Sequence, residues 1–433
     1  MNEAASDGLR IRAPEAAAAL LRDADLRRVF AALDVKGEET RVVGGALRNA
    51  LLQRPVQEID LATTLLPEAV AARAAAAGLR AIPTGIEHGT ITVLAGKKTF
   101  EVTTLREDIE TDGRRAKVRF GRDFRADALR RDFTINALSM TAGGWLYDYT
   151  RGLGDIASRN VRFIGDPSRR IAEDNLRILR FFRFSAEFGE GPLDREGRSA
   201  ALRLRDGLAR LSRERVRAEL LKLVCARRAS EVLSEMSGDG LLHGLLASVP
   251  NAARVRRVIE IASGSPADPV LRLAALCIHL PEDAARLREL LRLSNTETER
   301  LEAAGRALVT LHGRDGPPAG SGLQALLYRH GRQAASDALV LAQADDDPEN
   351  AALWDEARNN VAATAELRLP FSGADLVARG IGEGRAVGEA LKELEAAWIN
   401  AGFPTDPAHL DRLIEEAVQK REAHREGGAR RTG

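Results

Sequence analysis

The chain has 433 residues, of which 44% are hydrophobic and 29% charged, and its formal net charge is +1. The chain is too long to fold around a single hydrophobic core, so we expect two to four domains. No apolar run is long enough to span a membrane, and the N-terminus, with Glu3 and Asp7, has no apolar stretch typical of a targeting peptide. Only two cysteines, Cys225 and Cys277, are present, and the seven histidines are scattered, which argues against a disulfide framework or a zinc cluster and favours a cytoplasmic protein.

The small net charge hides an uneven distribution. Residues 151–230 hold 19 Lys and Arg against 11 Asp and Glu, and residues 114–131 hold 8 against 2. A basic middle between acidic ends is typical of a surface that binds a phosphate backbone. Solvated, arginine-rich helix faces are the alternative interpretation.

In chain order, an alanine-rich helix is expected over 15–32, followed by alternating strand and helix signals up to about Tyr149. A β-hairpin is predicted over 89–102, with its turn at Gly96 and Lys97. Beyond Tyr149 nearly every periodic segment is helical, and glycine-rich breaks fall at 237–240 and 312–322. The pattern predicts an α+β fold, with a mixed-sheet domain followed by helical domains.

The segment RVVGGALRNALLQRPVQEIDLA (41–62) predicts a short strand, a glycine turn and the start of a helix. Two acidic residues follow. Glu58 and Asp60 are two residues apart, so on a strand they point to the same face and can hold one divalent cation. An acidic pair at this spacing is more often a solvated strand edge. Its position directly after a glycine turn favours the metal site.

That turn is formed by Gly44 and Gly45, which let the backbone approach an anion closely. A helix that begins near Ala46 would present free N–H groups to a triphosphate, with Arg48 one step inside it. A Gly-Gly pair after a strand is most often a plain turn. The order of strand, turn, helix and acidic pair favours a nucleotide site.

These residues resemble the class II nucleotidyltransferases, which comprise bacterial CCA-adding tRNA nucleotidyltransferases and poly(A) polymerases. The resemblance covers nearly the whole chain in the order of the family and implies a polymerase β-like head followed by a neck, a body and a tail. The expected domains are residues 1–149, 150–237, 238–315 and 316–433. The segments that carry the resemblance, beyond 41–62, are PTGIEHGTITV (83–93), FEVTTLRED (100–108), DGRRAKVRF (112–120), DALRRDFTINALSM (127–140), LYDYTRGLGDI (146–156), RIAEDNLRILRFFRF (170–184), LSRERVRAELLKLV (211–224) and LPFSGADLVARGIGEGRAVG (369–388).

Two positions depart from the family. Glu58 stands where the family usually has aspartate, which keeps the charge and the ligand oxygens but adds a methylene. Asn49 also replaces an aspartate and puts only a supporting contact in doubt.

The resemblance implies roles for particular residues. It implies that Glu58 and Asp60 bind Mg²⁺ ions, and that Glu101 supplies a third carboxylate, with a plain strand-surface acid as the alternative. The residues expected to bind the nucleotide are Gly44, Gly45, Arg48, Arg130, Arg131, Asp132, Asn136, Asp174 and Arg177, and those expected to bind RNA are Arg180, Arg183, Arg213 and Arg217.

The segment EDNLR (173–177) is expected to choose the base. On a helix Asp174 and Arg177 face the same way, and the default interpretation is a solvated salt bridge. Cytosine and adenine each present a ring-nitrogen acceptor beside an amine donor, whereas uracil and guanine present a ring N–H beside a carbonyl. An arginine donor next to an aspartate acceptor therefore accepts CTP and ATP and rejects UTP and GTP without a template.

The expected activity is the addition of CCA to the 3′ end of tRNA from CTP and ATP. A polar stretch over 106–125 matches a flexible loop of the family that is thought to be short in enzymes adding only the two cytidines. The glycine turns at 380–388 suit either phosphate contacts or helix packing. A poly(A) polymerase, a partial A-adding or CC-adding enzyme, and a non-catalytic RNA-binding protein are the alternatives, and the oligomeric state stays open.

Overall fold

The computed structural model describes residues 8–86, 89–112, 115–382 and 384–429. The chain divides into two compact units, Met1–Leu241 and Leu242–Gly433. Glu3 and Asp7, on which the expectation about targeting rests, lie outside the described residues. No helix within the described ranges is long and apolar enough to cross a membrane.

The first unit begins with an eight-stranded sheet in the order β1-β10-β9-β2-β3-β6-β5-β4. All neighbouring strands pair antiparallel except β3 and β6, which are parallel, so the sheet is mixed and the predicted α+β fold is confirmed. Its strands are β1 (Leu9–Arg12), β2 (Thr40–Val43), β3 (Ile59–Thr63), β4 (Arg80–Gly85), β5 (Thr90–Ala95), β6 (Lys98–Thr104), β9 (Ser139–Thr141) and β10 (Trp145–Asp148).

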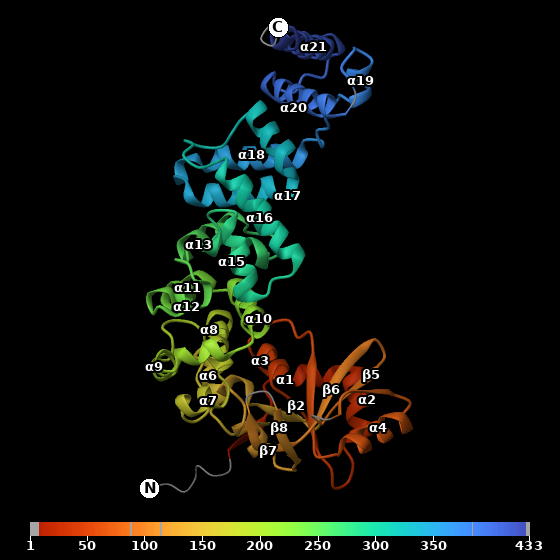
Figure 1. Cartoon of the computed structure of the whole chain (residues 1–433). Helices are drawn as coiled ribbons and strands as arrows, with labels where there is room; N and C mark the ends of the chain where they lie inside the picture. Colours follow the sequence, from red (N-terminus) through yellow and green to blue (C-terminus); the bar gives the residue numbers. More distant parts are fainter. Residues whose placement is uncertain (1–7, 87–88, 113–114, 383, 430–433) are drawn as a thin grey trace. The chain divides into compact units, whose positions relative to one another are not determined.

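The predicted hairpin is formed by β5 and β6. Ala95 pairs with Lys98, so Gly96 and Lys97 make the turn as predicted. Phe100 and Val102 of β6 are buried while Glu101 between them is exposed, because successive side chains of a strand point to opposite faces. Helices α2 and α4 pack against this end of the sheet (Figure 1).

A second hairpin occupies the polar stretch that matched the flexible loop of the family. Strands β7 (Arg106–Asp112) and β8 (Arg115–Phe120) form a separate two-stranded antiparallel sheet. Gly113 and Arg114 between them lie outside the described residues. The two strands pair from Arg106 with Phe120 to Asp112 with Arg115, with a register shift between Asp108 and Glu110.

The prediction of one continuous helix over 15–32 is wrong. The structure has α1 (Glu15–Ala18), a 3₁₀ turn (Ala19–Arg22) and then α2 (Ala24–Leu33). Asp23 ends the first segment because its carboxylate accepts hydrogen bonds from the backbone N–H groups of Asp25 and Leu26, at 2.9 and 3.1 Å, and so caps a new helix.

The remaining helices of the first unit frame the sheet and build the segment after it. Phe133, which follows α5, packs against Phe163 and Phe184, with ring centroids 4.9 and 5.2 Å apart. This aromatic cluster joins the sheet region to α8 in one core. The helices are α3 (Gly45–Leu51), α4 (Pro67–Ala76), α5 (Phe124–Leu129), α6 (Gly152–Ala157), α7 (Pro167–Glu173), α8 (Leu176–Phe188), α9 (Arg195–Arg203), α10 (Arg213–Val224) and α11 (Ala229–Gly238).

The second unit is helical throughout its described residues. The side chain of Arg254 is fully buried and donates hydrogen bonds to the carbonyls of Ala274, Ala275 and Ile278, which lie at the end of α14. A further apolar cluster around Leu394 and Trp398 forms near the C-terminus. The helices are α12 (Leu241–Leu246), α13 (Ala252–Ile261), α14 (Pro269–Cys277), α15 (Glu282–Leu291), α16 (Asn295–Val309), α17 (Ser321–Asp345), α18 (Ala351–Ala363), α19 (Gly373–Val377), α20 (Arg385–Asn400) and α21 (Pro407–Ala429).

The glycine-rich breaks coincide with helix boundaries. Residues 237–240 lie between the last turns of α11 and the start of α12, and residues 312–322 lie between α16 and the first turn of α17. Gly384 is the N-terminal cap of α20, and Glu383 beside it lies outside the described residues. The division into four domains stays a prediction.

Candidate active site

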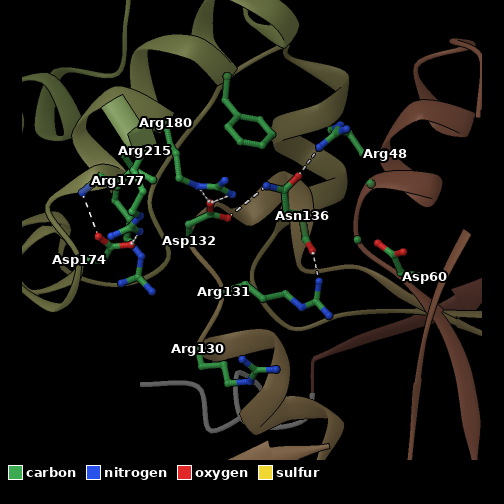
Figure 2. Close-up of a pocket in the computed structure, with 14 residues that line it drawn as sticks. Arg48, Asp60, Arg130, Arg131, Asp132, Asn136, Asp174, Arg177, Arg180 and Arg215 are labelled. Carbon is green, nitrogen blue, oxygen red and sulfur yellow. Dashed lines mark hydrogen bonds and ion pairs between the residues drawn. The ribbon is translucent and has the colours of Figure 1, made fainter. Parts of the chain in front are cut away.

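A polar cavity of about 470 Å³ opens in the first unit (Figure 2). Six arginines and three aspartates line it, so the empty cavity carries an excess of positive charge that suits a polyanion. The lining residues are Gly44, Gly45, Arg48, Asp60, Arg130, Arg131, Asp132, Asn136, Asp174, Leu176, Arg177, Arg180, Phe184 and Arg215.

Asp60 lies at one end of the cavity, and the charges of two further acidic residues act on its carboxylate. The register of the sheet pairs Asp60 with Glu101 on the parallel strand β6, and Glu58 lies directly before β3. All three residues keep part of their surface exposed, although neighbouring groups crowd the carboxylate of Asp60. Loss of hydration raises the pKa of Asp60, and the negative charges of Glu101 and Glu58 raise it further.

The donor set suits a hard divalent cation, because three carboxylates that repel one another gain from a shared positive charge. Within the described residues, however, no group of three or more His, Cys, Asp or Glu side chains is arranged closely enough to hold a metal ion. The acids therefore do not form a preassembled cage. Magnesium typically binds one or two protein carboxylates together with phosphate oxygens of the substrate.

The glycine turn lies where the sequence predicted it. Gly44 follows β2, and its neighbour on that strand, Val43, pairs with Asp60. Gly44 has φ of 69° and ψ of −126°, and a Cβ atom there would lie 3.0 Å from Nη1 of Arg131. The turn thus needs glycine for its backbone conformation and for the close approach of a pocket arginine.

Arg130 and Arg131 are both oriented by Asp127, a residue that the sequence interpretation did not single out. Arg130 Nε donates to Asp127 Oδ1 at 2.9 Å, and Arg131 Nη2 donates to Oδ2 at 3.0 Å. These ion pairs lower the pKa of Asp127 in spite of its burial, which alone would raise it. The spacing of i, i+3 and i, i+4 in the sequence DALRR was a signal that could have revealed this contact.

A chain of polar contacts crosses the cavity from Arg48 to Arg180 (Figure 2). Arg48 donates to Asn136 Oδ1 at 2.6 Å, Asn136 donates to Asp132 Oδ1 at 3.2 Å, and Arg180 Nε donates to Asp132 Oδ2 at 2.8 Å. Asp132 is buried, and although burial raises its pKa, Arg180 and Asn136 outweigh it and lower the pKa overall. The structure thus brings four predicted site residues into one network.

Asn49, one of the two departures from the family, retains a contact. Its Oδ1 atom accepts hydrogen bonds from Nε and Nη2 of Arg48, at 3.1 and 2.9 Å. The partner is neutral, however, and burial together with nearby Arg183 lowers the pKa of Arg48 to about 10. Arg48 also stacks on Phe188, 3.9 Å from the ring centroid.

The expectation that Asp174 and Arg177 share one helix is wrong. Helix α7 ends at Glu173, Asp174 is extended with φ of −155° and ψ of 108°, and α8 begins at Leu176. Asp174 Oδ1 accepts from the N–H of Leu176 at 3.1 Å, which favours the helix start over a continuous helix. The alternative interpretation, a salt bridge between Asp174 and Arg177, is not found among the described residues: Asp174 Oδ2 pairs with Arg215 at 2.7 Å, and Arg177 pairs with Glu173.

Both side chains nevertheless line the cavity, at the end opposite Asp60 (Figure 2). Arg215 joins them from α10, and sequence reasoning missed it because no local pattern connects positions 174 and 215. Its contact depends on the packing of α10 against α8.

Two of the four residues predicted to bind RNA have internal partners instead. Arg180 pairs with Asp132 and Glu219, and Arg183 pairs with Glu219 and stacks on the ring of Phe184. Their guanidinium groups neutralise buried carboxylates in this structure, and their assignment as phosphate contacts stays a prediction. Arg213, which is exposed, and Arg217, which is half-buried, lie on α10, and their assignment stays a prediction.

The glycine turn, the acids at the sheet and the arginine-lined cavity define a nucleotidyltransferase. Residues 40–162 match the model of the poly(A) polymerase head domain, and residues 193–254 match a model described as the probable RNA and SrmB-binding site of polymerase A. Enzymes of this family generally use a divalent metal ion.

Individual proteins match over most of the chain. The mitochondrial CCA tRNA nucleotidyltransferase 1 of Danio rerio is 36% identical over 368 residues, which is 83% of each chain. The CCA-adding enzyme of Limosilactobacillus fermentum is 30% identical over 390 residues, 88% of this chain and 93% of the relative. The crystal structure of the Bacillus stearothermophilus CCA-adding enzyme in complex with CTP has a TM-score of 0.73 and 27% identity, covering 92% of this chain and 98% of that one.

The chain therefore belongs to the family of CCA-adding tRNA nucleotidyltransferases and their poly(A) polymerase relatives, and the resemblance noted in the sequence is confirmed.

Proposed function

We propose that this chain adds CCA to the 3′ end of tRNA, without a nucleic-acid template, from CTP and ATP with Mg²⁺, and that it releases pyrophosphate. The observation that carries the proposal is the cavity itself, which has Asp60 at one end, the acceptor Asp174 and the donors Arg177 and Arg215 at the other, and arginines between them. The relatives of 30% and 36% identity, both named for CCA addition, support the same activity.

At the acidic end, Asp60 and Glu58 would hold the metal together with phosphate oxygens of the substrate, and Glu101 would help to bind it or to activate the hydroxyl. Bound Mg²⁺ supplies charge neutralisation at the α-phosphate and orients the 3′-hydroxyl of the RNA. Arg130 and Arg131, preoriented by Asp127, donate hydrogen bonds to the triphosphate, and their charges stabilise the departing pyrophosphate. The backbone at Gly44 allows the phosphates to approach closely.

At the opposite end, Asp174 accepts a hydrogen bond from the exocyclic amine of cytosine or adenine, and Arg177 donates to the adjacent ring nitrogen. Arg177 uses Nη1 for contacts with Glu173 and the carbonyl of Arg170. Within the described part of the chain its Nε and Nη2 donate to no other group, which leaves these donors to the base. Uracil and guanine present a donor where Arg177 donates, so they are rejected.

The test is incubation of the purified protein with tRNA that lacks CCA and with each triphosphate in turn, resolved at single-nucleotide length. We expect two additions with CTP alone, a third when ATP is also present, and none with UTP or GTP. Absence of any addition to tRNA in the presence of Mg²⁺ would refute the proposal. Activity with Mn²⁺ but not Mg²⁺ would refute only the choice of metal.

The name of the matching head model favours a second candidate, a poly(A) polymerase. The same assay separates the two, because a poly(A) polymerase extends an unstructured oligonucleotide with ATP alone into a long product. An enzyme that adds only part of CCA stops after two cytidines or needs a primer that already ends in CC.

We also propose that the protein acts in the cytoplasm. Cys225 and Cys277, the cysteines of the described chain, are free thiols, which supports a reducing compartment. Some relatives carry a mitochondrial name. Subcellular fractionation with an antibody against the protein distinguishes the two locations.

A further inference from the structure

The arginine pair proposed to bind the triphosphate, here called the phosphate end, and Arg177 of the base-reading end come from separate elements. Arg130 and Arg131 follow α5, whereas Arg177 lies in the first turn of α8 (Figure 2). A nucleotide that bridges both ends needs its base contacts and its phosphate contacts at a fixed separation. Something must therefore set the position of one end relative to the other.

Arg170 of α7 contacts both ends from outside the cavity wall. Its buried guanidinium donates through Nη2 to the carbonyl of Leu129, at 2.9 Å, and to the carbonyl of Arg131. These carbonyls flank Arg130. The backbone that carries the two arginines of the phosphate end is thus held by one side chain of α7.

The other branch of the same guanidinium reaches the base end. Arg170 Nη1 donates to Glu173 Oε2 at 2.8 Å, and Arg177 Nη1 donates to that same carboxylate oxygen and, at 2.8 Å, to the backbone carbonyl of Arg170. The position of Arg177 therefore depends on Glu173 and Arg170. Glu173 has its pKa lowered overall because Arg177 and Arg170 outweigh its partial burial, so it stays a charged acceptor.

We propose that Arg170 is a positioning residue that couples the base-reading end of the cavity to its triphosphate end, with Glu173 as the connecting acceptor. This inference rests on the proposed function. When the base pairs correctly with Asp174 and Arg177, Arg130 and Arg131 are held where they bind the triphosphate. A wrong base shifts Arg177 and, through Arg170, this arginine pair as well. Arg170 touches neither the base nor the phosphates, and it acts through Arg177 and the backbone beside Arg130.

A second observation concerns the remaining donor of this guanidinium. The Nε atom of Arg170 is buried and has no hydrogen-bond partner among the described residues. A buried donor without a partner costs about 1–3 kcal/mol. The two Nη groups of the fork make all of these contacts, and a single donor group could not reach both carbonyls and the carboxylate at once.

The decisive experiment is a double-mutant cycle between Arg131→Lys and Arg177→Lys, measured as kcat/KM for CTP on tRNA lacking CCA. In the parent protein we expect the two changes to be coupled by a factor of about five or more. In an Arg170→Gln background, where the fork is lost, we expect the coupling factor to fall to about one, and the preference for CTP over UTP to fall about five- to tenfold.

Arg198→Gln is the matched control. Arg198 makes a two-pronged ion pair with Asp239, both contacts at 2.9 Å, away from the cavity. The Arg198→Gln change should lower the melting temperature but leave the coupling factor and the preference for CTP over UTP unchanged. If Arg170→Gln does not fold, Arg170→Lys, which keeps the charge but has one donor group instead of a fork, serves in its place.

A coupling factor close to one in the parent protein would overturn the inference. So would an Arg170 variant that keeps both the coupling and the CTP preference, even if its melting temperature is lower. Failure of the proposed function is read separately, because the parent protein would then add no nucleotide to tRNA at all.

Discussion

Asp60 carries a negative charge that its surroundings disfavour. Its raised pKa means that ionised Asp60 destabilises the folded protein. This cost is absent below the ordinary value of 3.8 and appears as the pH rises through the raised pKa. Activity should follow the opposite trend, since the ionised form binds the metal.

We therefore expect Asp60→Asn to raise the melting temperature slightly at neutral pH without Mg²⁺, and to lower activity by about a thousandfold or more, as removal of several kcal/mol of charge stabilisation implies. Calorimetry with and without Mg²⁺, together with single-nucleotide extension, checks both. Added Mg²⁺ should stabilise the parent but not the variant. Full activity in the variant would remove Asp60 from the site.

Glu58 offers the complementary change. Glu58→Asp restores the shorter acid usual in the family, and because Glu58 is exposed just before β3, the change leaves core packing untouched. We expect extension activity equal to or above that of the parent in a titration with Mg²⁺. A large loss would mean that the backbone here is adapted to the longer side chain.

Asp174 tests base choice. Asp174→Ala should weaken the use of both CTP and ATP and relax the rejection of UTP, because the acceptor for the amine is lost. A hydrogen-bonded base contact contributes about 1–3 kcal/mol of discrimination, so the CTP preference over UTP should fall by about one to two orders of magnitude. Competition assays with both nucleotides measure this ratio.

Arg215→Ala provides the control, since it breaks the same 2.7 Å ion pair but leaves the acceptor in place. It should retain more of the preference than Asp174→Ala does. Equal losses in the two variants would mean that Asp174 acts only through its pairing with Arg215.

Among the elements, the turn between β2 and α3 gives the sharpest prediction. Gly44→Ala forces a side chain into a backbone region that only glycine adopts readily, at a cost of about 1–3 kcal/mol, and pushes on Arg131. We expect lower stability and a higher KM for CTP and ATP. Thermal unfolding and steady-state kinetics measure the two effects.

Gly320 is a matched position. Gly320 also caps a helix, with φ of 52° and ψ of −125°, but no atom of the described residues beyond its chain neighbours lies within 4 Å of where its Cβ would be. Gly320→Ala should reduce stability by a similar amount and leave the KM unchanged. A higher KM in both variants would show that the effect of Gly44→Ala is not specific to the pocket.

The elements also show what the sequence can predict. The strand, turn and helix at 41–62 and the hairpin turn at Gly96 depend on local patterns, and both were predicted correctly. The breaks at Asp23 and Asp174 were missed because the periodic pattern continues through them, while a side-chain cap competes with the next helical hydrogen bond. The partners of Asp174 and Arg180 depend on contacts with residues far along the chain, which no spacing rule reveals.

For the whole molecule, the basic middle of the chain predicts the salt dependence of tRNA binding. The affinity should fall linearly on a log–log plot against salt, with a slope of about −0.7 to −0.9 per phosphate contact. Arg213→Ala and Arg217→Ala should each reduce the magnitude of the slope by about that amount. Filter binding over a salt series measures it.

Arg22→Ala is the control, because Arg22 is exposed and pairs with Glu15 near the start of the chain. It should leave the slope unchanged. An affinity independent of salt would mean that the arginines of residues 151–230 are merely solvated. Equal binding of tRNA and an unstructured oligonucleotide of the same length would favour the polymerase alternative.

The surplus of arginines over aspartates in the cavity has a consequence for the direction of the reaction. The charge that attracts a nucleoside triphosphate attracts pyrophosphate as well, so the leaving group binds where it is formed. By microscopic reversibility the same residues then catalyse pyrophosphorolysis, in which pyrophosphate removes the last nucleotide from the RNA. The same pocket therefore serves both directions, and a low concentration of pyrophosphate favours net synthesis.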